Sequence, residues 1–453
     1  MQKKSIGFGF RGWMLILYQA IAYVTFQCFT QYPLNILSDF YGGATVVSKY
    51  YSITAMVGIV IQLLLVRPFS RAKNVKLIGT VLGAITLVLA IGVMALPPMP
   101  LWYVCYAAIN VFSVLYATFT LGILVGQWFP TRKGTVMGIA TLAFPIANGL
   151  LGPFASSVFA PIGMASAMGQ QPVIFGLGGA IGKAFLPFFI VSVIGWLIGI
   201  IFVTDYPEQC GAYRDNDKSL TPEIAKAIMM AEIENKRTSV WTFVHTLACA
   251  EYWFSTLTIA ALLSCSIGLM SQTNAMITAY AELDYTTVMM LIAAFGCIGS
   301  YVIGILDTKI GTKKAMIISS VLMIISGILG NIPGPTTLVI ALLFVALFMG
   351  ASSNFGVSCA AQYWRREDFA RIFTLSSPIG SAISSAAPMV IAGLLFGATG
   401  YKGHGGVFVF VGVCGVIATI LMILFNPAHI KKMDDKYRTK AGKELDDALV
   451  GRK

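Results

Sequence analysis

Long apolar stretches, separated by short polar segments, recur along the whole chain. Twelve of these stretches approach or exceed the length that crosses a bilayer, because about 20 residues at 1.5 Å rise span the hydrocarbon core. The expected spans are Trp13–Leu37, Ala44–Val66, Leu77–Leu96, Leu101–Phe129, Thr135–Phe159, Phe185–Val203, Tyr252–Ala279, Val288–Leu306, Ala315–Leu329, Leu338–Trp364, Ile372–Phe396 and Val407–Phe425. The pattern therefore predicts an all-α membrane protein with twelve transmembrane helices.

One sizeable polar segment interrupts this pattern near the middle of the chain. It contains an amphipathic stretch from Pro222 to about Lys236, preceded by Thr221 as a suitable N-cap. We interpret it as a cytoplasmic linker with a surface helix. The expected domains are an N-terminal six-helix bundle (1–203), the linker (204–240), a C-terminal six-helix bundle (241–425) and a charged, partly disordered cytoplasmic tail (426–453).

Basic residues gather on alternate connectors. With both termini inside, 28 of the 31 Lys and Arg residues fall on the cytoplasmic side, and only Lys49, Lys183 and Lys402 fall on the other. This is the asymmetry of the positive-inside rule, and one missed helix would reverse it for all later clusters. The pattern supports twelve spans and predicts a multi-pass inner-membrane protein with cytoplasmic termini.

Composition agrees with this topology and narrows the function. The chain of 453 residues is 57% hydrophobic and 11% charged, with a mean hydropathy of +0.80. The net charge of +12 is explained by the loops, so no nucleic-acid partner is expected. Eight scattered cysteines without a C-x-x-C pair predict no metal site. The first span exceeds the apolar region of a signal peptide, so we expect a retained helix.

The two halves of the chain carry a repeated feature. Arg132–Lys133 precedes Pro145 by the spacing at which Arg365–Arg366 precedes Pro378, and the two sites lie 233 residues apart. Each basic pair follows a span that has a tryptophan near its end, Trp128 or Trp364. Basic loops and membrane prolines are common, but the shared position and the half-chain offset favour duplication of a six-helix unit. Such duplication is one architecture of secondary transporters.

Two loop motifs carry a family resemblance. Residues 127–139, QWFPTRKGTVMGI, and residues 304–314, GILDTKIGTKK, resemble the loops after helices four and eight of the major facilitator superfamily. The second loop departs by one residue on either side of Asp307, and its first-half counterpart lacks the acid. The resemblance covers nearly the whole chain and implies two pseudo-symmetric six-helix bundles that alternate between two openings. It also implies gating by loop charges, for which the candidates are Arg132, Lys133, Asp307, Lys313, Arg365 and Arg366; an ordinary interfacial charge cluster is the alternative.

A weaker resemblance concerns the substrate. Residues 207–216, PEQCGAYRDN, are similar to the stretch after helix six in oxalate/formate-antiporter-like organic-anion carriers, which favours a carboxylate. Those carriers are expected to bury a Lys or Arg in helices eight and eleven. The spans Val288–Leu306 and Ile372–Phe396 contain neither, so the substrate class does not carry over.

Recognition without a buried charge has to rest on amides, hydroxyls and aromatic rings. The resemblance implies that helices one, four, seven and ten line the cavity, and polar groups at mid-membrane depth face protein or water. The candidate substrate-binding residues are Tyr23, Gln27, Gln31, Asn110, Ser113, Tyr116, Gln272, Asn274, Ser353 and Asn354. The competing interpretation is that these side chains only join helices by hydrogen bonds.

The sequence thus predicts a secondary active or facilitative transporter of a small organic solute, working by alternating access as a monomer without cofactor. Glu251 is expected at the inner mouth of the seventh helix, and it becomes the proton-coupling candidate if that helix begins earlier. Coupling to H+ or to a counter-substrate stays open. A membrane-embedded enzyme or a channel is the alternative, but no H-E-x-x-H, G-x-S-x-G, T-V-G-Y-G or P-loop motif occurs.

Overall fold

The computed structural model describes residues 7–35, 37–72, 74–167, 172–217, 219, 221–235, 239–397 and 405–443. Within these residues no strand occurs, and twelve helical segments are long and apolar enough to cross a membrane. Nine of the segments are single helices: α3 Ala44–Arg71, α4 Val75–Ala95, α9 Ala180–Phe202, α12 Ala250–Thr278, α13 Tyr285–Ile310, α14 Thr312–Gly330, α15 Pro335–Tyr363, α16 Phe369–Gly397 and α17 Gly405–Leu424. The twelve predicted spans are confirmed, with helix ends shifted by a few residues.

The first, fourth and fifth spans are composite. The first joins α1 (Phe10–Phe26) to a π-helical turn, η1 (Gln27–Gln31), and to α2 (Tyr32–Asn35). The fourth joins α5 (Pro100–Val114), a second π-helical turn, η3 (Leu115–Thr120), and α6 (Leu121–Trp128). Because π-turns insert a residue into the helix, they re-aim the side chains that follow, and they are frequent at functional sites.

The fifth span consists of α7 (Lys133–Ala140) and α8 (Ala143–Ala167), separated by Thr141 and Leu142. Pro145 explains this break. A proline has no backbone N–H and crowds the carbonyl four residues earlier, which here belongs to Thr141. Pro378, the equivalent proline of the second half, instead lies inside the uninterrupted α16.

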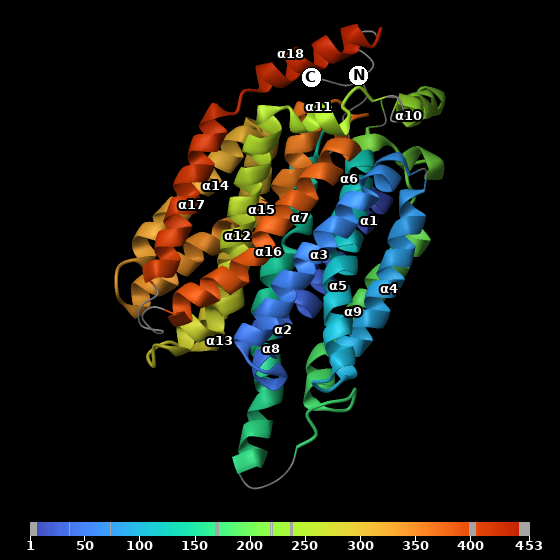
Figure 1. Cartoon of the computed structure of the whole chain (residues 1–453). Coiled ribbons are helices and arrows are strands. Elements are labelled where there is room, and N and C mark those ends of the chain that lie inside the picture. The colour runs from blue at the N-terminus through green and yellow to red at the C-terminus, as the bar shows by residue number, and fades with distance from the viewer. Residues whose placement is uncertain are drawn as a thin grey trace.

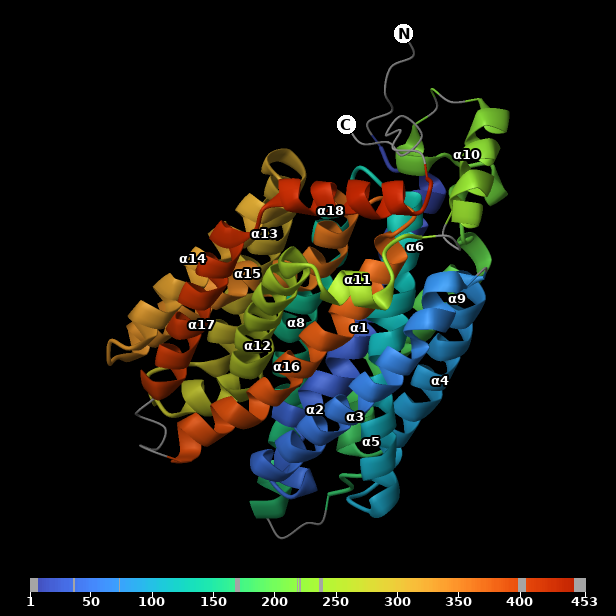
Figure 2. The same cartoon turned by 45° about the horizontal axis from the view of Figure 1, so that its top comes forward.

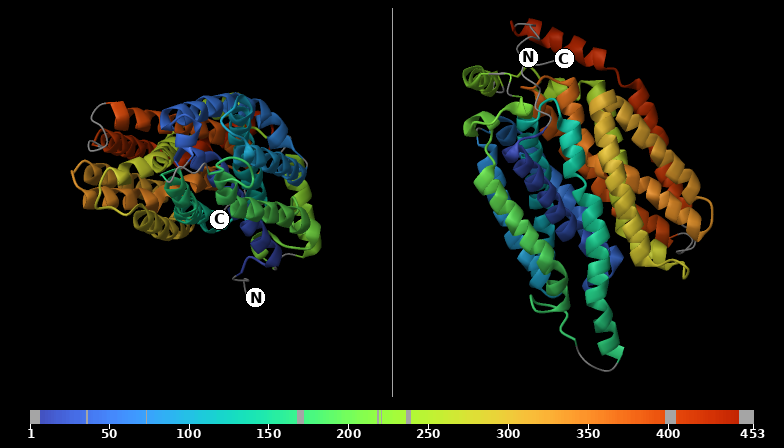
Figure 3. Two further views of the ribbon diagram at one scale, coloured as in Figure 1. Left: turned by 90° about the horizontal axis from the view of Figure 1, so that it is seen from below. Right: turned by 180° about the vertical axis from the view of Figure 1, so that it is seen from behind.

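The spans form two groups that lie side by side (Figure 1). Helices α1 to α9 make one group and α12 to α17 the other, as the view along the bundle shows (Figure 3, left). Helix α3 packs on α16, and α7 and α8 pack on α13. The first half therefore meets the second mainly through its second and fifth spans.

Glycines allow the closest approach between the halves. At Gly138 of α7, an added Cβ would lie 3.0 Å from Cα of Gly304 and 3.0 Å from the carbonyl oxygen of Ser300, both on α13. Backbone atoms cannot yield as a flexible side chain can. Any larger residue at Gly138 would therefore separate α7 from α13.

The polar elements gather at one end of the bundle, here named the basic end (Figure 2). They comprise the short helices η4 (Pro207–Cys210), η5 (Arg214–Asn216) and α11 (Phe243–Leu247), and the longer α10 (Pro222–Asn235) and α18 (Pro427–Lys440). A further short helix, η2 (Ser38–Tyr41), follows α2. The predicted surface helix of the linker corresponds to α10.

Residues 427–440 of the charged tail are helical. These residues form α18, which buries Ile430, Asp434 and Arg438 on one face. Asp434 accepts hydrogen bonds from Arg365 Nε at 2.7 Å and from Trp241 Nε1 at 2.9 Å. Ion pairs therefore hold α18 against the rest of the protein, although its charged composition had indicated a solvated segment.

Candidate functional site: a central polar cavity

A cavity of ≈ 110 Å³ lies between the two halves. The first half contributes α1, η1, α3, α5, η3 and α8, and the second contributes α12, α15 and α16. The polar lining residues are Gln27, Gln31, Tyr51, Thr118, Asn148, Ser266, Ser271, Ser352, Ser353, Ser376, Ser377, Ser381, Ser384 and Ser385. Among the described residues, no Asp, Glu, Lys, Arg or His lines this cavity.

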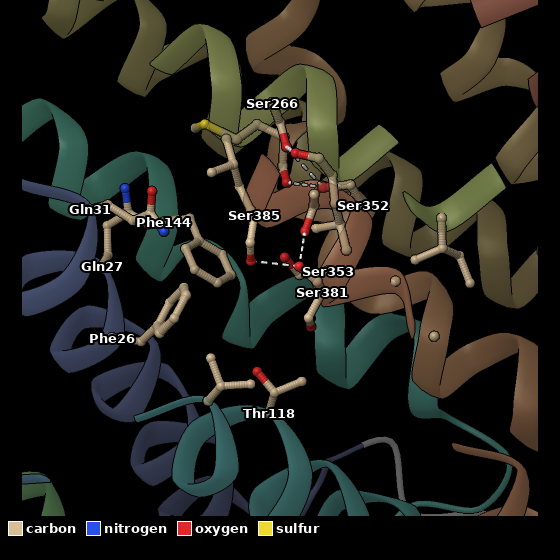
Figure 4. A pocket seen from close by; sticks show the side chains of 18 of the residues that line it. Phe26, Gln27, Gln31, Thr118, Phe144, Ser266, Ser352, Ser353, Ser381 and Ser385 are labelled. Carbon is tan, nitrogen blue, oxygen red and sulfur yellow. Dashed lines mark hydrogen bonds between the residues drawn. The ribbon is translucent and has the colours of Figure 1, made fainter. Parts of the chain in front are cut away.

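The wall from the first half consists of amides and aromatic rings. Gln27 Nε2 donates to Asn148 Oδ1 at 2.8 Å, and Gln31 Nε2 donates to the Tyr51 hydroxyl at 2.6 Å. Phe26 and Phe144 stand beside the glutamines (Figure 4). Both glutamines belong to η1, so this π-helical turn forms part of the cavity wall.

The wall from the second half consists largely of serine hydroxyls (Figure 4). Several of them donate their proton to a carbonyl of their own helix, as Ser271 does to Gly268 at 2.7 Å and Ser352 to Met349 at 2.7 Å. The same holds for Ser266, Ser376, Ser384 and Ser385. A hydroxyl has one proton and two lone pairs, so the groups left for a ligand are hydrogen-bond acceptors.

The halves contact each other at the end of the cavity that is far from the basic end. There the Ser52 hydroxyl of α3 donates to the Ser385 carbonyl of α16 at 2.8 Å. The short α2 packs against α12 at the same end.

A second set of contacts lies toward the basic end. The rings of Phe369 and Phe373 on α16 pack directly on Gly126 and Gly122 of α6. The ammonium of Lys133 lies 4.1 Å from the centre of the Phe369 ring, a cation–π contact between the halves. The cavity is thus flanked on both sides by contacts between the halves.

Comparisons with solved structures agree with this arrangement. A crystal structure of a double-tryptophan mutant of XylE matches with a TM-score of 0.65 and 13% identity, covering 94% of this chain and 98% of that chain. The human organic anion transporter MFSD10 (TETRAN) matches with a TM-score of 0.56 and 12% identity, covering 91% of this chain and 97% of that chain. Both are major facilitator superfamily transporters.

The chain adopts the major facilitator fold. Among the described residues, its twelve candidate membrane spans form two pseudo-symmetric six-helix bundles, as predicted. No protein-family model matches the sequence, and no curated protein matches it. At these identities the likeness establishes the fold alone, so function has to be argued from the cavity.

Within this major facilitator fold, three of the ten predicted substrate-binding residues line the central cavity: Gln27, Gln31 and Ser353. Asn110 lines a smaller cavity nearby. Tyr23 lies behind Phe144, with 4.7 Å between ring centres.

The other predicted residues take part in contacts within the bundle. Asn354 Nδ2 donates to Thr141 Oγ1 at 3.1 Å and so joins the halves. Ser113 donates to the Ile109 carbonyl at 2.6 Å. Tyr116 packs near Tyr18, Gln272 Nε2 lies 3.5 Å from Ser271 Oγ, and the Asn274 carbonyl accepts from Thr278. Of these residues, Asn354 and Tyr116 contact another helix, whereas the contacts of Ser113, Gln272 and Asn274 lie within their own helix.

Sequence reasoning missed the lining residues of α3, α8 and α16. It searched only the four helices that the family resemblance suggested. A signal was present, since Ser377, Ser381 and Ser384 recur at a spacing that shares one helical face. Ser376, Ser384 and Ser385 donate to backbone carbonyls of α16, and they also line the cavity.

The predicted gating residues separate into two groups at the basic end. Lys133 contacts Phe369 across the halves, and Asp307 Oδ1 accepts from Thr312 Oγ1 at 2.5 Å beside Gly134 of α7. Lys313 instead donates to the Phe425 carbonyl at 2.6 Å, within its own half.

The remaining gating candidates face the linker and the tail. Arg366 Nε lies 3.4 Å from Glu232 of α10, and Arg365 binds Asp434 of α18. The backbone N–H of Arg132 lies 3.2 Å from Asp215 Oδ1. Burial raises the pKa of the Asp215 carboxyl and lowers the pKa of the Arg366 guanidinium. Their role in gating stays a prediction.

Glu251 lies in the first turn of α12 and is 3% exposed. The helix begins two residues earlier than predicted, which buries the carboxylate. His429 Nδ1 of α18 lies 2.8 Å from Glu251 Oε1. Glu251 does not line the central cavity, and its carboxylate contacts the tail helix; its role in coupling stays a prediction.

Proposed function

We propose that this protein carries a small neutral organic solute across the inner membrane by alternating access of the central cavity. The observation that carries the proposal is a polar cavity lined by both halves of a major facilitator fold. Cavities of this kind between two duplicated bundles hold the substrate in secondary transporters.

The lining argues for a neutral solute. A charged ligand at mid-membrane depth is costly unless a counter-charge or many strong dipoles surround it. The described lining residues offer amides, hydroxyls and aromatic rings without a charged side chain. A carboxylate substrate, which the linker resemblance had favoured, lacks a cationic partner among them.

The orientation of the hydroxyls narrows the solute further. Because most lining serines have committed their proton to their own helix, they present acceptors. A solute with several O–H or N–H donors would match them, while its carbon skeleton packs on Phe26, Phe144 and Phe373. A small hydroxylated compound is the class that fits best.

The contacts on either side of the cavity support alternating access. Contact of Ser52 with Ser385 and of Phe369 with Gly126 cannot both persist while solute enters and leaves. We propose that one set breaks while the other holds, as the bundles rock about the cavity with 204–240 as their linker. The excess of Lys and Arg supports a cytoplasmic position for the basic end, which is part of this proposal.

Counterflow in liposomes containing the purified protein tests this proposal. Vesicles preloaded with an unlabelled polyol or monosaccharide should transiently accumulate the labelled compound, with saturation. The second arm tests charged solutes, namely organic carboxylates and alkylamines. Carboxylates are included because MFSD10 is an organic anion transporter. Saturable counterflow of anions alone would overturn the neutral-solute class. Flux that never saturates would favour a channel, and a chemically altered solute would favour an enzyme.

A further inference from the structure

The two π-helical turns of the first half lie against the same cavity. Gln27 and Gln31 of η1 and Thr118 of η3 all line the central cavity (Figure 4). A π-turn adds one residue to a helix, and one residue corresponds to a rotation of about 100° and a rise of about 1.5 Å. The two turns therefore determine which side chains of the first and fourth spans face the cavity.

Each π-turn accepts a hydrogen bond from the span that carries the other turn. The Tyr106 hydroxyl of α5 donates to the backbone carbonyl of Thr30 in η1 at 2.8 Å. Gln19 Nε2 of α1 donates to the backbone carbonyl of Ala117 in η3, also at 2.8 Å. All four residues are fully buried. The two bonds are reciprocal, because the fourth span supports the turn of the first and the first span supports the turn of the fourth.

The carbonyls of a π-turn need donors of this kind. In an α-helix each carbonyl accepts the N–H four residues further along, whereas a π-turn shifts the partner to five residues. Thr120 Oγ1 bonds the Leu115 carbonyl of η3 at 2.9 Å across five residues, in keeping with this shift. Buried carbonyls whose regular partner is displaced are generally paired by another donor. A buried side chain that supplies the donor therefore favours the π-turn over a regular helix.

The Tyr106 hydroxyl is itself fixed in direction. The Tyr106 ring stacks on the Trp102 ring, with 5.1 Å between ring centres and 14° between planes, and Trp102 stacks in turn on Tyr41 at 3.7 Å. The backbone carbonyl of Tyr106 accepts a hydrogen bond from Asn110 Nδ2 at 2.7 Å. A donor held by such packing can select one geometry of the turn that it contacts.

We propose that Tyr106 and Gln19 are positioning residues for solute recognition. Neither belongs to the described lining of the central cavity, so neither contacts a solute held there. They act by holding η1 and η3 in the geometry that directs Gln27, Gln31 and Thr118 into the cavity. The inference rests on the solute site proposed above, and it adds the two residues that shape the wall from the first half.

Cysteine labelling of the full chain tests the inference without a solute. In a cysteine-free background, Gln27→Cys reports on η1 and Thr118→Cys reports on η3. Tyr106→Phe removes only the hydroxyl, so a small impermeant thiol reagent should label position 27 at least fivefold more slowly, with position 118 changed less than twofold. Gln19→Met nearly retains the side-chain volume and should have the opposite pattern, slowing position 118 and sparing position 27.

Tyr41→Phe is the matched control. The Tyr41 hydroxyl donates to the Leu96 carbonyl at 2.9 Å, outside both π-turns, and its ring also stacks on Trp102. This variant should leave both reporters within twofold of their parents. Equal slowing of both reporters in Tyr106→Phe or Gln19→Met would indicate general loosening, and no slowing in either would show that the turns do not need these bonds; both results would overturn the inference. Parent reporters that the reagent reaches from neither side would instead overturn the proposed transport, and this inference with it.

Kinetics separate positioning from folding. With the labelled polyol or monosaccharide of the counterflow assay, Tyr106→Phe should raise the KM about three- to tenfold without a matching fall in kcat. In a background that carries Gln27→Ala and Gln31→Ala, the same substitution should raise the KM less than twofold, because the side chains that it positions are already absent. An equal factor in both backgrounds would mean that Tyr106 acts independently of the two glutamines, and its positioning role would fall.

Discussion

The hydroxyl of Ser52 donates a hydrogen bond to the backbone carbonyl of Ser385, 2.8 Å away. It joins α3 of one half to α16 of the other at the end of the central cavity far from the basic end. Both residues are buried. A carrier that opens at this end has to break the bond, so its strength should set part of the balance between conformations.

Removing this hydroxyl should favour opening at that end. A hydrogen bond contributes about 0.5–1.5 kcal/mol, so Ser52→Ala should shift the equilibrium roughly two- to tenfold. In a cysteine-free background, a reporter cysteine at cavity residue Ser381 should react faster with an impermeant thiol reagent added from that side. Thr54→Ala is the control, because the Thr54 hydroxyl bonds only within α3. Equal labelling rates in the two variants would contradict the prediction.

A larger residue at position 138 should favour opening of the cavity at the basic end. The backbone of Gly304 and Ser300 leaves no space for a side chain, so Gly138→Val should push α7 away from α13. We expect faster labelling of the same reporter from the basic side and a loss of most transport. Gly393→Val, at a position where nothing lies within 4 Å, is the matched control and should be nearly silent.

Gln27 and Gln272 were both predicted to bind the substrate, but the structure places them differently. Gln27 lines the cavity, whereas Gln272, although buried, does not. Gln27→Ala should therefore raise the KM for transport about tenfold, the equivalent of about 1.4 kcal/mol of binding. Gln272→Ala should change KM less than twofold. Equal KM values for both variants would show that the cavity residues do not bind solute.

The helices were predictable because each span depends on a composition that only a bilayer tolerates. The cavity was less predictable because it depends on which face of each helix turns inward. Ser353 and Asn354 are neighbours on α15, yet Ser353 lines the cavity and Asn354 binds Thr141. The π-turn at Gln27–Gln31 rotates the side chains that follow it, and the apolar periodicity of the sequence does not predict such a turn.

The helix in the tail was not predicted, for a related reason. Ile430, Asp434 and Arg438 lie four residues apart and share one face of α18, but two of the three are charged. A search for apolar periodicity passes over a face that is buried by ion pairs. Only the placement of Arg365 and Glu367 opposite this face reveals it.

This ionic face makes α18 sensitive to single substitutions. Asp434→Asn should remove the buried carboxylate charge that Arg365 Nε and Arg438 Nε both contact. Breaking a buried pair in this way costs about 3–5 kcal/mol, so the Tm should fall by several degrees. Asp435→Asn, at the next and more exposed position, is the control and should shift the Tm little. A similar fall in both would assign the effect to the helix rather than to the pair.

Asp368 should give the cluster a dependence on pH. Burial raises the pKa of its carboxyl from 3.8 to about 7, against the opposing effects of the Ser239 hydroxyl and Arg438. Because the folded-state pKa lies above the unfolded one, the folded protein holds this proton more tightly. The stability that Asp368 contributes is therefore full below about pH 4 and is lost as the pH rises to about 7. Asp368→Asn does not titrate, so the Tm of wild type minus that of the variant should decrease steadily across this window. A difference that stays flat would show that Asp368 is ionised throughout and is held by Arg438.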